Sequence, residues 1–124
     1  MAGSSITFTE SPLSSMRKIK AVWVSDSSAG TASSTTTNYY DGRFIGLITV
    51  PGTSSLKPSD NYTVTVKDGD GVDLLLGAAT ANRDDTNTEF VKEADMAGVA
   101  ASTLTFAVSG AGNSKGGTIY LLIR

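Results

Sequence analysis

The chain has 124 residues, a formal net charge of −2, and neither cysteine nor histidine. This length is typical of one domain, and the missing residue types exclude disulfides, histidine-based metal sites and serine–histidine–aspartate triads. Charged residues make up 18% of the chain, against about 25% in an average soluble domain. The mild acidity argues against binding to a nucleic-acid backbone.

Short segments in which apolar and polar residues alternate predict seven or eight β-strands, because period-2 alternation rich in Val, Ile, Thr, Tyr and Phe is typical of half-buried strands. The cleanest alternation runs over residues 61–67, where Tyr62, Val64 and Val66 share one face. In chain order, the predicted strands span residues 5–10, 17–25, 42–50, 61–67, 72–76, 88–91 (the weakest), 103–109 and 117–124.

Turn residues separate these segments. Asp-Gly-Asp-Gly at 68–71 predicts a tight turn, and the Gly-rich stretch 111–116 predicts a hairpin loop. Residues 27–38 are polar and predict a long loop, and residues 91–101 predict at most a short helix because Gly98 weakens it. The pattern predicts an all-β, single-domain sandwich or jelly-roll-like fold with little or no helix. Residues 1–16 are expected to form an N-terminal arm with one short strand, and residues 17–124 the sandwich.

Several predicted strands are apolar on both faces, although a small sandwich normally keeps its outer faces polar. Trp23 shares a face with Ile19 and Ala21 and is expected in the core. The outward-facing apolar residues need cover from another subunit or from a loop or arm of the same chain. The candidates for an interface on these strands are Val22, Ile45, Leu47 and Tyr120.

The arm and one loop supply further interface candidates. Ile6 and Phe8 lie on one face of the arm strand, which is expected to pair either with a neighbouring subunit or with its own chain. Tyr39 and Tyr40 end the polar loop, where aromatic residues serve either packing or an interface.

The acidic residues suggest no catalytic or metal site. Asp68, Asp70 and Asp73 have spacing found in calcium loops, but the glycine comes too early for an EF-hand and a hairpin turn accounts for them. Acid pairs among residues 84–93 lack the aromatic walls of a sugar cleft. We therefore expect no enzyme, no metal and no cofactor. Residues 1–10 lack the basic start and apolar core of a signal peptide, and no apolar run is long enough to span a membrane, so synthesis in a cytoplasm and no membrane partner are expected.

The closing segment 104–124, the stretch 81–91, and the richness of the whole chain in Ser, Thr, Gly and Ala resemble small structural proteins of tailed bacteriophages. Among these, the chain most resembles the capsid decoration (cement) proteins. The resemblance implies a β-rich protein, often a homotrimer, that sits on the outer capsid surface of the virion and clamps neighbouring copies of the major capsid protein. It assigns no role to any single residue.

Two other functions remain open. The first is a tail, neck or baseplate component of the same kind of particle, since these are also small β-rich proteins that oligomerise. The second is a carbohydrate-binding module in which Tyr39, Tyr40 or Trp23 would stack on sugar rings. The physical features agree with the decoration protein, because interface cores are depleted in charge and assembly stabilises a small domain.

Overall fold

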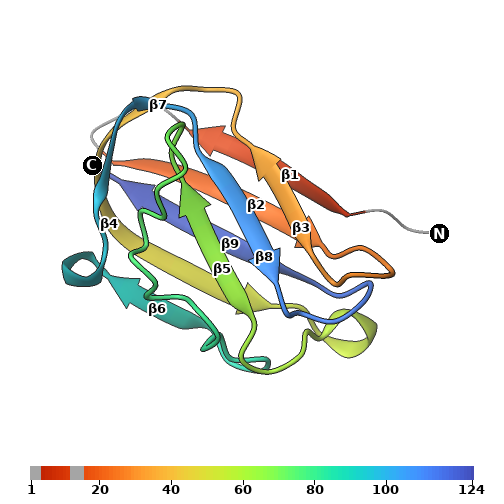
Figure 1. Ribbon diagram of the computed structural model, residues 1–124. Helices are drawn as coiled ribbons and strands as arrows, with labels where there is room; N and C mark the ends of the chain where they lie inside the picture. Colours follow the sequence, from red (N-terminus) through yellow and green to blue (C-terminus); the bar gives the residue numbers. More distant parts are fainter. Residues whose placement is uncertain (1–3, 12–15) are drawn as a thin grey trace.

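Two antiparallel sheets face each other in the computed structural model, which describes residues 4–11 and 16–124. Figure 1 shows the smaller sheet lying across one face of the larger sheet. The prediction of an all-β sandwich is confirmed. The larger sheet has the order β1 (Ser5–Ser11), β2 (Arg17–Val24), β9 (Gly116–Ile123), β4 (Tyr40–Pro51) and β6 (Glu89–Lys92), with β7 (Gly98–Ser102) paired to the start of β4. The smaller sheet has the order β3 (Ala32–Thr35), β8 (Thr105–Ser109) and β5 (Thr63–Lys67).

The core fills the space between the sheets, where alternate residues of each strand meet. Trp23 is fully buried, as predicted, and its ring lies 5.6 Å from that of Tyr62. Burying a large apolar side chain contributes about 1.5–3 kcal/mol relative to leaving it exposed, so these rows hold the two layers together. The other fully buried large side chains of the strands include Ile19, Phe106, Ile119, Leu121 and Ile123.

A β-bulge in β4 changes which residues face the core. The sequence predicted Phe44, Ile48 and Val50 on one face and Ile45 and Leu47 on the other. In the structure the register against β9 shifts between Phe44 and Gly46, and both Phe44 and Leu47 are fully buried. An extra residue in one strand reverses the alternation beyond it, so the predicted faces of the second half of β4 are wrong.

The polar stretch 27–38 contains a strand, which corrects its prediction as a loop. β3 pairs antiparallel with β8, and Ala32 is its single buried apolar residue. The next residue after the strand, Thr36, is buried and its hydroxyl accepts a hydrogen bond from the Leu104 amide at 3.0 Å. A strand this short, with one apolar side chain, has too little alternation to be recognised.

One further predicted strand is missing from the structure. Within residues 72–76, Asp73 forms an isolated β-bridge to Lys67 and residues 74–76 form turns, in which the Asp73 carboxylate accepts hydrogen bonds from the amides of Leu75 and Gly77, each at 3.1 Å. Residues 91–101 contain the end of β6, one 3₁₀ turn, η2 (Glu93–Asp95), and then β7, which agrees with the prediction of at most a short helix. Another 3₁₀ turn, η1 (Ser54–Leu56), follows β4.

β1 belongs to the segment expected to form an arm. Its register pairs Ile6 with Trp23 and Phe8 with Ala21 of β2 in the same chain. The remaining arm residues, 1–3 and 12–15, lie outside the described residues. The described part of the arm is therefore the edge strand of the larger sheet.

Candidate functional site

The larger sheet has an outer face, turned away from the smaller sheet, that is apolar along its middle. We call this the outer sheet face and define it by the outward residues of β2, β9, β6 and residues 46–50 of β4. One cross-strand row contains Lys20, Tyr120, Ile48 and Phe90 on four neighbouring strands. A parallel row contains Val22, Thr118 and Val50, and a third contains Lys18, Leu122, Gly46 and Lys92.

Phe90 is the most exposed large apolar residue on this face, with 59% of the residue accessible to solvent. A Cβ atom added at Gly46 would meet the Phe90 Cε1 atom at 2.6 Å, so the ring lies directly over the glycine. Val22 is also exposed, at 42%, whereas Ile48, Tyr120 and their apolar neighbours are half-buried. The face is thus an open apolar surface without a cavity.

The charges on the outer sheet face have one sign. Lys18, Lys20 and Lys92 border its apolar rows, and the outward positions that define the face hold no carboxylate. The Lys18 ammonium lies 5.6 Å from the centre of the Tyr120 ring, within the range of a cation–π contact. The face is therefore basic although the whole chain is mildly acidic.

The carboxylates of the two edge strands, β1 and β6, point to the other side of the sheet. The Tyr40 hydroxyl donates to Glu10 Oε1 at 2.7 Å. Glu89 Oε1 lies 3.7 Å from Arg83 Nη1 and accepts a hydrogen bond from the Asp84 amide at 2.8 Å. Each acid is held by a specific partner away from the lysines.

Arg83 joins the two sheets through a polar contact inside the sandwich. Its backbone exchanges hydrogen bonds with Asn61 and Tyr62 beside β5, while its guanidinium reaches Thr49 Oγ1 at 3.4 Å and the Glu89 carboxylate of the larger sheet. Only 6% of the residue is exposed. Burial raises the pKa of the neighbouring Tyr62 hydroxyl to about 12.

Of the eight predicted interface residues, Val22 and Tyr120 lie on the outer sheet face. Leu47 and Tyr40 are buried in the core, which corrects their prediction as interface residues. Desolvation raises the pKa of the Tyr40 hydroxyl well above its usual value, and its hydrogen bond to Glu10 raises it further. Ile45 is half-buried at the bulge.

The other three predicted residues lie away from the outer sheet face. Ile6 and Phe8 are half-buried on the core side of β1, and the Phe8 ring meets that of Phe106 edge-on at 5.3 Å. Tyr39 is 74% exposed next to β4. With Trp23 and Tyr40 buried, Tyr39 is the one exposed member of the three aromatic residues considered for sugar stacking.

Sequence reasoning missed Phe90, Ile48 and Val50. Phe90 falls in the weakest predicted strand, and its neighbours in the chain did not show on which face it would lie. Ile48 and Val50 were assigned inward because the bulge in β4 has no distinct sequence signal. Their apolar character was visible, but the direction of their side chains was not.

The acidic turns of the chain are held by their own backbone. Asp68 Oδ1 accepts hydrogen bonds from the amides of Asp70 at 3.0 Å and Val72 at 3.1 Å. Asp84 accepts from the Thr86 amide and the Asn87 side chain, each at 2.9 Å. The Thr86 bond, followed by that from Asn87, lowers the pKa of Asp84.

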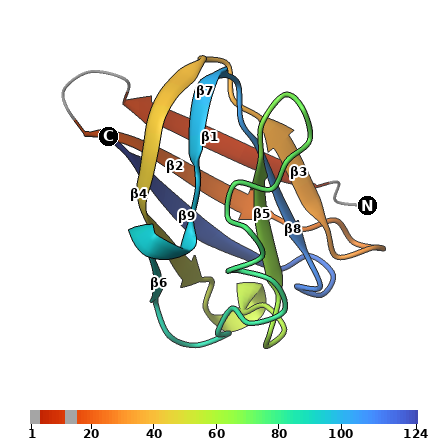
Figure 2. The same cartoon turned by 60° about the vertical axis from the view of Figure 1, so that its left-hand side comes forward.

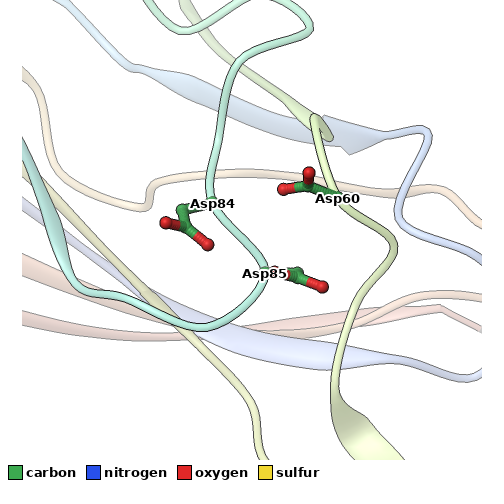
Figure 3. A group of neighbouring side chains, drawn as sticks. All are labelled: Asp60, Asp84 and Asp85. Carbon is green, nitrogen blue, oxygen red and sulfur yellow. The ribbon is translucent and has the colours of Figure 1, made fainter.

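Asp60, Asp84 and Asp85 bring carboxylate oxygens within 4.8 Å of one another. Figure 3 shows Asp84 and Asp85 on one loop and Asp60 on the segment beside it. Asp85 also pairs with the Lys57 ammonium at 3.7 Å. These partners account for Asp84 as part of a turn and for Asp85 as the counter-charge of Lys57.

The described residues form no pocket. Within the same residues, no helix has the length and apolar character needed to cross a membrane. Comparison of the chain with protein-family models, curated proteins and solved structures finds no match. The outer sheet face is therefore a candidate site because of its open apolar surface and its lysines.

Proposed function

We propose that this chain is a structural protein that docks through its outer sheet face onto another protein of an assembled particle. The specific form we propose is a capsid decoration protein on the outside of a tailed-phage head, in keeping with the resemblance described above. The observation that carries the proposal is the apolar row of Tyr120, Ile48 and Phe90 on a sheet face that the described residues of the chain leave open.

The exposed apolar area of the outer sheet face and the lysines around it both support the proposal. A contiguous exposed apolar patch costs solvation free energy in a monomer and is typical of an interaction site. The lysines around it match a partner surface that bears carboxylates, because complementary charges steer association and set the orientation of docking. Decoration places many copies on one particle, so weak single contacts add up through multivalency.

A tail, neck or baseplate component is the second candidate, because it would use the same kind of docking face. The two candidates differ in which particle carries the partner surface. Purified heads and purified tails, each prepared without this chain, separate them directly.

The test is co-sedimentation of the full chain with those heads and tails. We expect the wild-type chain to bind heads, and Phe90→Glu to weaken binding at least tenfold by placing a charge in the apolar row. Ser33→Glu is the matched control, because it puts the same charge on the exposed surface of β3 in the smaller sheet.

Each outcome decides between the candidates. Binding to tails alone, with the same loss in Phe90→Glu, would replace the decoration role by the tail role. Binding to neither particle would overturn the virion proposal, and binding that Phe90→Glu leaves unchanged would show that another surface docks.

A further inference from the structure

The outer edge of β1 has no partner strand among the residues that the structure describes. β1 ends the strand order of the larger sheet and has β2 on one side only. Among the described residues, its backbone hydrogen bonds all go to β2. Figure 2 shows β1 beside β2 in the larger sheet, and across the sandwich β1 contacts β3 of the smaller sheet. A row of unpaired amides and carbonyls is a template for another strand.

Within Ser5–Ser11, this edge lacks the usual protection against strand addition. Proteins commonly guard edge strands with lysine, proline, bulges or very short length. β1 has seven residues and pairs with β2 without a bulge. Its single charged side chain, Glu10, is engaged by the Tyr40 hydroxyl at 2.7 Å and the Asn38 amide at 3.3 Å. The opposite edge strand, β6, has only four residues and begins and ends with charged side chains.

The core side of β1 is also incompletely covered. Ile6 and Phe8 pack against the core but stay half-buried at the open side of the sandwich. A strand added beyond β1 would cover both side chains and satisfy the free backbone groups at the same time. The edge thus presents hydrogen-bonding groups and apolar surface to one incoming strand.

We propose that this occupant is β1 of a second copy of the chain, paired antiparallel about a two-fold axis through Phe8. Phe8 is the central residue of β1, so this register pairs all seven residues. It sets Phe8 opposite Phe8, Ile6 opposite Glu10 and Thr7 opposite Thr9. Antiparallel pairing over this length forms about six to eight backbone hydrogen bonds, and a two-fold contact is self-complementary.

The pairing joins two larger sheets into one continuous sheet and sets two outer sheet faces side by side. It goes beyond the proposed function and does not depend on it, because β1 and the outer sheet face are separate surfaces. It differs from the trimer that the resemblance implies, since a self-complementary edge contact closes at two copies.

The experiment is the solution mass of the full chain by light scattering. We expect about 25.6 kDa, twice the 12.8 kDa of one chain. Thr7→Glu/Thr9→Glu sets carboxylates opposite each other across the axis and is expected to give a monomer. Thr7→Lys/Thr9→Glu sets opposite charges across the axis and is expected to restore the dimer. In both variants the carboxylate at position 9 faces Lys20 within one chain, so the variants differ only at position 7.

A wild-type mass of one chain, or of three chains near 38.4 kDa (3 × 12.8), would overturn the proposal. A dimer that survives in Thr7→Glu/Thr9→Glu would also overturn it, as would a dimer that Thr7→Lys/Thr9→Glu does not restore. Phe90→Glu is the control on the outer sheet face and should leave the dimer intact. If it gives a monomer instead, the copies meet through that face and not through β1. Near-ultraviolet circular dichroism confirms the fold of each variant.

Discussion

The two sheets share one core, yet their outer faces differ sharply. The outer face of the smaller sheet consists mainly of small polar side chains, such as those of Ser33, Thr65 and Thr105. The outer face of the larger sheet has Val22, Ile48 and Phe90 at the corresponding outward positions. Folding requires only the inner faces to be apolar. The larger sheet therefore has an outer apolar surface that its fold does not require. This additional apolar surface indicates a binding partner.

The largest expected effect comes from comparing the inner and outer faces of the larger sheet at two neighbouring leucines of β9. Leu121 is fully buried between the sheets, and Leu122 points outward. Leu121→Ala is expected to lower the free energy of unfolding by about 2–5 kcal/mol, as for other buried leucines. Leu122→Ala is expected to cost less than about 1 kcal/mol, in the range of surface changes, while weakening docking.

Urea unfolding of the purified variants measures both free energies. The two substitutions remove the same atoms from adjacent positions, so the change in strand propensity and the change in side-chain size are the same in both variants. Equal losses of stability would mean that the outer sheet face is covered within the chain and is no docking surface.

The shared core can be tested by raising the pH. Burial raises the pKa of Tyr62 to about 12 from its ordinary value of 10, so the unfolded chain loses this proton first. The stability contributed by the neutral phenol is present below pH 10 and is lost between pH 10 and pH 12. We expect the unfolding free energy to fall over this window, and Tyr62→Phe to make the fall shallower, since Tyr40, whose pKa is also raised, still contributes.

Far-ultraviolet circular dichroism at graded pH gives the measurement. Tyr62 lies against Trp23 of the larger sheet, so both sheets are expected to unfold in one transition. Two separate transitions would show that the sheets are not joined by a single core.

The smallest expected effect comes from exchanging polarity between the two outer faces. Val22→Thr and Thr65→Val each change one side chain with almost no change in shape. Each is expected to alter the unfolding free energy by no more than about 0.5 kcal/mol. Val22→Thr should weaken docking in the sedimentation assay by a few fold, and Thr65→Val should leave it unchanged. A larger loss in Thr65→Val would move the docking surface to the smaller sheet.

The sequence alone showed that several strands of the candidate site are apolar on both faces. Val22 and Tyr120 were placed outward correctly, because β2 and β9 alternate without interruption. Leu47 was placed outward wrongly, and Ile48 inward wrongly, because one extra residue near Ile45 reverses the rest of β4. Periodicity gives the direction of a side chain only while the pairing stays in register.

The amino-acid sequence by itself determined the class of the fold, since alternating Val, Ile, Thr and aromatic residues separated by turn residues have few stable solutions other than packed sheets. It also determined that Ile19, Ala21 and Trp23 share the core side of one strand. The tertiary structure alone decided that β3 exists and that Phe90 lies over Gly46 on an open face. The reason is that both features depend on strand pairing between residues far apart in the sequence, which no local pattern records.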